Sequence, residues 1–305
     1  QVDACDRALA GGLKLTKYVK VQYPAGKKES DYYRLGRDGK PANDWHKKPV
    51  PEVSNPEMIA YARKLSEADV GVLKDHPAFA GALAVSENRD HTFPSYHTEQ
   101  NRYRQATGVE PPPEAVKKVC DPKYAKARFP DGVVPEDDPV LRYYRWFWNG
   151  GDGWPAYLSA IADGYRRGGY GRFEDGSDLQ KKRPFFTFHD PAVRCPPIWG
   201  SGGDVDCLNQ WCYANPEPMN VAGPVEEMFA MAEGRPGQQV MIMTQLICYR
   251  NQLAPKNVKV DPEPDWVKRR PGADFPSIPP DTLQEATWSM IAKPVRGIMY
   301  HGWGC

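Results

Sequence analysis

The residues best placed to do chemistry follow a run of apolar side chains. Residues 79–85 (FAGALAV) lack polar alternation, which is typical of a strand buried on both faces of a helix-covered parallel sheet. The sequence then turns polar at Ser86, Glu87 and Asn88. Barrels of parallel strands build their active sites at the carboxyl ends of the strands. Glu87 is therefore a candidate general acid, with a loop carboxylate paired to Arg89 as the alternative.

Asp190 is the second candidate carboxylate, because it follows the apolar strand pattern PFFTFH at 184–189. The role of a second carboxyl group depends on its distance from the first: about 5–5.5 Å suits a nucleophile, and roughly 6.5–9.5 Å leaves room for an activated water. An Asp before a proline, here Pro191, is also an ordinary turn former. Asp152 and Asp206 are weaker rivals for the same role.

Polar and aromatic residues near the ends of other predicted strands are candidate ligand contacts. An arginine at such a position can hold a carboxylate or a charged sugar, and a tryptophan can stack on a sugar ring. Trp146 and Trp148 lie inside a helical pattern, so they are assigned to the core. The predicted substrate-binding residues are Asn88, His189, Tyr213, Gln245, Tyr249, Arg250, His301 and Trp303.

Motifs for metals and cofactors do not occur in the sequence. The histidines form neither an HxH pair nor an HExxH helix, and no CxxC pair is present, so no metal site is predicted. No GxGxxG or GxxxxGK[ST] motif occurs, so no nucleotide cofactor is predicted either. Cys195, Cys207 and Cys212 lie close enough in sequence for a local disulfide, but free buried thiols are equally compatible with an odd count of seven cysteines.

Composition limits the classes of partner. The chain has 305 residues, 40 Lys plus Arg and 39 Asp plus Glu, which gives a net charge of +1 without blocks of like charge. Neither nucleic acid nor an acidic membrane surface is an expected partner. No apolar run reaches the roughly 20 residues of a membrane span. The oligomeric state is left open.

Strand and helix patterns alternate along the chain. Helical patterns start at Asn55-Pro56, Asp138-Pro139, Trp154, Pro224 and a predicted capping box at 281–284. A long polar loop is expected at 25–55. Strand patterns lie at 15–23, 79–86, 184–189, 206–216, 239–250 and 296–303.

This alternation predicts an α/β fold of parallel βαβ units within a single domain, residues 1–305. A (β/α)8 barrel is favoured over an open doubly wound sheet because the nucleotide-binding motifs are absent. Six strand patterns predict an incomplete barrel that lacks its first two units. The isolated chain is then expected to aggregate or to be unstable, since an open barrel leaves strand edges unpaired.

Three segments resemble (β/α)8 glycoside hydrolases, in particular β-galactosidase-like barrels and uncharacterised glycosidase-like proteins of environmental bacteria. They are Ser86–Asn88, PGQQV at 236–240 and MYHGWG at 299–304. The resemblance implies that the visible strands are the third to the eighth, that Glu87 is the acid/base residue, and that the substrate is a carbohydrate. It also implies a secreted or periplasmic protein.

The sequence departs from this family at the nucleophile. The family has a second Glu at the end of strand seven, where this chain has Gln245. Three functions remain open: a glycosidase that uses general acid catalysis, a catalytically silent glycan-binding barrel, and a non-glycosidic hydrolase. Gln245 favours the second.

Overall fold

The computed structural model separates the chain into two compact units, Gln1–Asp206 and Cys207–Cys305. It describes residues 2–36, 38–43, 47–85, 97–114, 131–133, 135–149, 154–170, 186–189, 203–212, 218–247, 265–269 and 278–301. Each unit contains three neighbouring parallel strands.

The first unit has the strand order β1 (Leu15–Val19), β2 (Phe79–Ala84), β3 (Phe186–His189). In the central strand, Leu83 lies between Tyr18 of β1 and Phe188 of β3. The helices and helical turns of this unit are α1 (Val2–Ala10), η1 (Glu29–Tyr32), α2 (Pro56–Leu73), α3 (His97–Thr107), α5 (Pro139–Asn149), α6 (Trp154–Tyr165) and η3 (Arg166–Tyr170).

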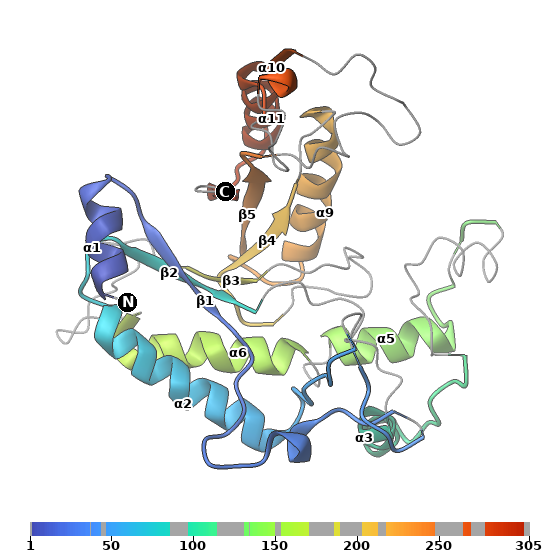
Figure 1. Cartoon of the computed structure of the whole chain (residues 1–305). Helices are drawn as coiled ribbons and strands as arrows, with labels where there is room; N and C mark the ends of the chain where they lie inside the picture. Colours follow the sequence, from blue (N-terminus) through green and yellow to red (C-terminus); the bar gives the residue numbers. More distant parts are fainter. Residues whose placement is uncertain are drawn as a thin grey trace. The chain divides into compact units, whose positions relative to one another are not determined.

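The second unit has the strand order β4 (Cys207–Trp211), β5 (Gln239–Gln245), β6 (Gly297–His301). Helix α9 packs against β4 and β5 (Figure 1). Its buried side chains include Val225, Met228 and Met231. The helices and helical turns are η4 (Pro218–Val221), α9 (Ala222–Ala232), α10 (Asp265–Lys268) and α11 (Pro280–Ile291).

The parallel α/β prediction is confirmed, whereas a barrel is not seen among the described strands. All six strands fall within the predicted strand patterns, and a helix lies between consecutive strands of each sheet. Within each unit the described strands form an open run of three, β1–β2–β3 and β4–β5–β6. A closed sheet needs every strand to have two neighbours, and β1 and β6 each have one in the described part of the chain.

Helix starts were predicted with mixed success. Asn55 caps α2 as expected, because its side chain accepts from the backbone N–H groups of Glu57 and Met58. The predicted capping box at 281–284 is wrong. The cap of α11 is Pro279, which provides no side-chain hydrogen bond, so Asp281 lies within the first turn of the helix.

The long loop after β1 is anchored by a buried arginine. Arg34 is fully buried, pairs with Glu52 at 3.2 Å, and places its guanidinium 5.5 Å from the ring centre of Phe147 on α5. Isolated bridges, such as that between Tyr33 and Pro51, link the two sides of the loop. A buried charge is tolerated only when it is paired, so Arg34 fixes the loop to α5.

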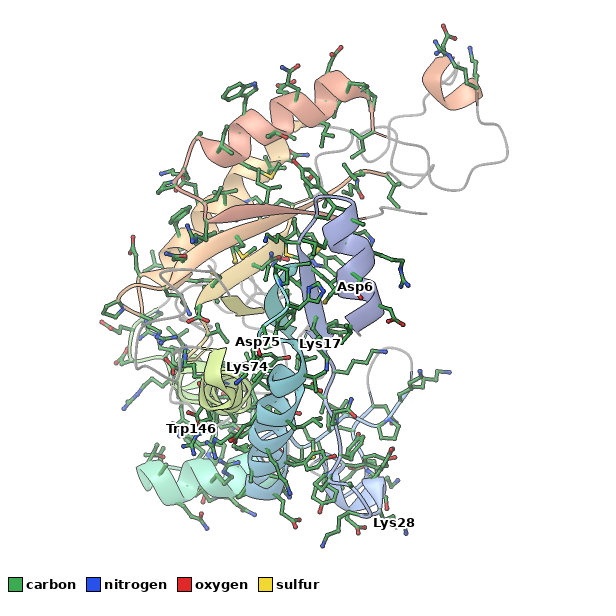
Figure 2. The ribbon with its side chains drawn as sticks, turned by 90° about the vertical axis from the view of Figure 1, so that its left-hand side faces the viewer. Asp6, Lys17, Lys28, Lys74, Asp75 and Trp146 are labelled. Carbon is green, nitrogen blue, oxygen red and sulfur yellow. The ribbon has the colours of Figure 1, made fainter. Side chains whose placement is uncertain are left out.

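Polar contacts connect the N-terminal elements of this unit. Lys17 of β1 forms an ion pair with Asp69 of α2, and Asp6 of α1 lies 2.9 Å from His76, just after α2 (Lys17 and Asp6 are labelled in Figure 2).

Trp146 of α5 packs with Tyr143 and Tyr103, at ring-centre distances of 6.0 and 5.2 Å. Trp146 was assigned to the core, but its side chain is only partly buried, and it packs at the side of this aromatic cluster. The side chain of Trp148 lies outside the described part. Cys207 and Cys212 are buried, and Cys195 lies outside the described residues.

Helices α2 and α6 pack side by side along their lengths (Figure 1). Gly164 of α6 allows this close approach. A Cβ atom at Gly164 would lie 2.2 Å from the carbonyl oxygen of Arg63 and 2.8 Å from Cβ of Ser66. Because one of these contacts is with backbone, the helices would have to separate.

We expect Gly164→Ala to destabilise the protein by about 1–3 kcal/mol, since overpacking displaces backbone. Gly71→Ala is the matched control on α2. No atom lies within 4 Å of the Cβ position there, so alanine should stabilise the helix by roughly 0.5–1 kcal/mol. Urea unfolding followed by circular dichroism measures both changes. Equal effects of the two substitutions would contradict the proposed close contact.

Candidate functional site

Two of the predicted site residues have described side chains. Gln245 ends β5 and His301 ends β6, and the two are direct neighbours in the parallel ladder. His189 ends β3, but its side chain is not described. The other predicted site residues, which lie outside the described part of the chain, are Glu87, Asn88, Asp190, Tyr213, Tyr249, Arg250 and Trp303.

The two predicted catalytic carboxylates follow neighbouring strands in the first unit. β2 and β3 are parallel, and Leu83 lies beside Phe188. Glu87 comes four residues after Leu83, and Asp190 comes two residues after Phe188. Both residues thus follow the carboxyl ends of paired strands, which is the edge where α/β proteins build their sites. Their catalytic roles stay predictions.

A strained residue lies directly before this segment. Val85 has a φ angle of 58° and is buried, and its N–H donates to the carbonyl of Val19 at 3.0 Å. A β-branched residue is very rarely left-handed, and strained backbone of this kind clusters at functional sites. Nothing in the sequence indicates this conformation, because valine is among the residues least suited to it.

Tyrosines gather beyond the end of β1, and the sequence reasoning missed them. Tyr23 lies edge-on to Tyr33 at 6.1 Å, and the hydroxyl of Tyr157 on α6 accepts a bond from the N–H of Gln22 at 3.4 Å. Burial, with smaller effects of Tyr33 and Glu29, raises the pKa of Tyr23 to about 12. Burial also raises the pKa of Tyr157 to about 12. The sequence signal that could have indicated this group of tyrosines was the position of Tyr23 at the end of the predicted strand 15–23.

An aromatic pair, Trp211 and His301, spans the sheet of the second unit. Their ring centres are 6.0 Å apart and their planes differ by 13°. Trp211 ends β4 and His301 ends β6, on opposite sides of β5. Neighbouring strands are separated by roughly 4.8 Å, so the two side chains must lean toward each other over β5. Trp211 is partly exposed and His301 is exposed.

The strand register shows which side chains share a face with this pair. Trp211 lies beside Met243, and His301 lies beside Gln245. Side chains alternate along a strand, so the pair crosses β5 between Met243 and Gln245 on one face. The amide nitrogen of Asn209 donates to the sulfur of Met299 at 3.4 Å, consistent with this assignment. The members of the face near the pair are Asn209, Trp211, Met243, Gln245, Met299 and His301.

Buried neutral polar groups lie on β4 and β5. Gln245 is 1% exposed, and its Nε2 has no hydrogen-bond partner among the described residues. Oδ1 of Asn209 is likewise buried and without a described partner. A buried amide group in this state costs about 1–3 kcal/mol. In the ladder Asn209 pairs with Met241, and Met241 comes four residues before Gln245 on β5. The two amides are therefore separated by roughly 13 Å along the strands, so they cannot belong to one site.

The two weaker candidate acids are Asp206 and Asp152. Asp206 forms an ion pair with Arg166 at 3.1 Å in the first unit, which gives it a structural role there. Burial opposes the charge of Arg166, but Asp206 and Asp204 raise its pKa overall. Asp152 lies outside the described residues. Among the described residues, no cluster of His, Cys, Asp or Glu could hold a metal ion, and no helix is long and apolar enough to cross a membrane.

Comparison with solved structures defines the fold more closely. A β-galactosidase from the psychrophilic Marinomonas ef1 matches 99% of this chain with a TM-score of 0.58 and 13% sequence identity. A β-galactosidase from Bacillus circulans sp. alkalophilus matches 98% with a TM-score of 0.52 and 13% identity. The chain therefore has a glycoside hydrolase-like fold, and it spans 46% and 42% of those two proteins. No protein-family model matches the sequence, and a search of curated proteins found no match.

The raised tyrosine pKa values predict a loss of stability at alkaline pH. The folded pKa of about 12 for Tyr157 lies above the ordinary value near 10, so its stabilising effect is complete below pH ~10 and is lost as the pH rises through 12. Tyr157→Phe cannot ionise and should show a smaller decline. Urea midpoints at pH 9, 10, 11 and 12 measure the difference; parallel curves for the two proteins would contradict it.

Proposed function

We propose that this chain is a glycoside hydrolase-like domain of (β/α)8 type that binds carbohydrate at the carboxyl ends of its strands. The observation that carries the proposal is the aromatic pair of Trp211 and His301 at the ends of β4 and β6. Flat, partly exposed rings supply large apolar contact area with a polar edge, which suits the apolar face and hydroxyl rim of a sugar. The likeness to two β-galactosidases supports a galactoside as the first ligand to test.

Binding without cleavage at β4–β6 is supported by the chemistry of this face. The described residues near the pair are amide, thioether, indole and imidazole groups, without a carboxylate. Canonical glycoside hydrolysis uses two carboxyl groups. The resemblance seen in the sequence puts a nucleophilic Glu at the end of strand seven, where this chain has Gln245.

We expect Trp211→Ala to weaken lactose binding about tenfold or more, because the largest contact surface of the site is removed. Isothermal titration calorimetry measures this affinity after a glycan array has tested other sugars. Trp288→Ala is the matched control, since Trp288 lies on α11 with 64% of its surface exposed. The proposal fails if no sugar binds the wild-type protein, or if the two tryptophan variants bind equally well.

Hydrolysis is the second candidate function, with Glu87 as general acid and Asp190 as its partner. The strained backbone at Val85, directly before Ser86, favours a functional role for the segment that contains Glu87. The pairing of β2 with β3 supports the choice of Asp190, because both acids follow the same edge of one sheet. A separation of their carboxyl groups beyond ~10 Å would exclude joint action on one bond.

If Glu87 is the general acid, Glu87→Gln should reduce kcat by about 10²–10⁴ while sugar binding is retained. The glutamine keeps the shape of the side chain but cannot transfer the proton. Release of nitrophenol from chromogenic β-galactosides measures the rate. Glu285→Gln, at an exposed position of α11, is the control. Full activity of the Glu87 variant, or a wild-type protein that cleaves none of the glycosides, would reject hydrolysis by this residue.

A further inference from the structure

The end of β5 holds a hydrogen-bond donor that the described chain leaves unused. Gln245 is 1% exposed, and its amide nitrogen has no partner among the described residues. The NH₂ group of glutamine can only donate. Buried donors in folded proteins are nearly always satisfied, so this group calls for an acceptor.

The position of Gln245 places that donor beside the aromatic pair. Gln245 is the direct neighbour of His301 in the ladder, and it shares its face of the sheet with Trp211. The backbone groups at the end of β5 and β6 are hydrogen-bonded to each other, because the N–H of Leu246 donates to the carbonyl of His301 at 2.8 Å. The side-chain amide of Gln245 is thus a buried donor next to the pair that still lacks a described partner.

The charge of the surroundings limits the ligand. Near Gln245, the described residues of this face are Trp211, Met243, Met299 and His301, which include no Lys, Arg, Asp or Glu. From these described side chains an ionised ligand would gain no fixed counter-charge to offset its lost hydration. A sugar hydroxyl or ring oxygen accepts a hydrogen bond from an amide without that cost.

We propose that Gln245 is a specificity-determining residue, whose amide donates to an oxygen of a neutral sugar held at the aromatic pair. This inference rests on the proposed function and adds the polar contact that selects the ligand. It also gives the amide a role in binding at the position where the family resemblance implies a nucleophilic carboxylate.

The test compares two substitutions on the same strand. Gln245→Met keeps approximate length and removes the donor, and it should weaken binding of methyl β-galactoside about tenfold or more. Gln239→Met is the control, because Gln239 is exposed at the opposite end of β5. It should bind like the wild-type protein. Calorimetry gives the affinities, and circular dichroism with thermal melting shows whether each variant is folded.

A measurement on the wild-type protein tests the same inference without a variant. At pH 8.0, methyl β-galactoside should bind at least about tenfold more tightly than galacturonate, which has the same ring but carries a carboxylate. Equal affinities would overturn the proposal, and so would a folded Gln245→Met variant with wild-type affinity. If Trp211→Ala still abolishes binding in that case, the proposed function stands and the role of Gln245 falls. If the wild-type protein binds neither sugar, both are rejected.

Discussion

The structure depends on two central strands that are buried along most of their length. β2 lies between β1 and β3 in the first unit, and β5 lies between β4 and β6 in the second unit. Along β5, every residue after Gln239 is buried, and along β2 every residue but Ala80 is buried. A strand in this position must be apolar, because helices or loops cover both faces of a parallel sheet. Polar chemistry is therefore confined to the strand ends.

At the end of β5 the last two residues are polar and still buried. Thr244 and Gln245 are 0% and 1% exposed. They lie on opposite faces, since side chains alternate along a strand. The aromatic pair leans over the face of Gln245, so a buried amide lies beside a partly exposed indole and an exposed imidazole. The proposed sugar site rests on this combination.

The first unit uses a different arrangement at its strand ends. The chain after β1 forms an ordered loop fixed by buried Arg34, and the chain after β2 begins with left-handed Val85. The close approach of α2 to α6, permitted by Gly164, supports the helical layer of this unit. Ordered loops and a strained residue beside strand ends are features of sites whose geometry is held by a rigid scaffold.

Local patterns in the sequence predicted the strands and most helices. The apolar run at 79–85 contains β2, and Asn55-Pro56 marks the start of α2, because burial on both faces and helix capping are local requirements with local signatures. The predicted capping box at 281–284 was wrong because α11 begins earlier, at Pro280, with Pro279 as its cap residue. His301 was placed near the end of its strand, whereas Gln245 ends β5 five residues before the predicted strand end at 250.

Tertiary structure decided which residues meet. The stacking of Trp211 on His301 joins positions 90 residues apart, and it depends on the parallel pairing of β4 and β6 with β5. The left-handed backbone of Val85 and the ion pair of Arg34 with Glu52 also depend on neighbours distant in the sequence or on packing. The sequence by itself determined where the buried strands lie, because hydrophobic periodicity is a local property. The structure decided their partners, because strand order and register are set by the packing of the whole sheet.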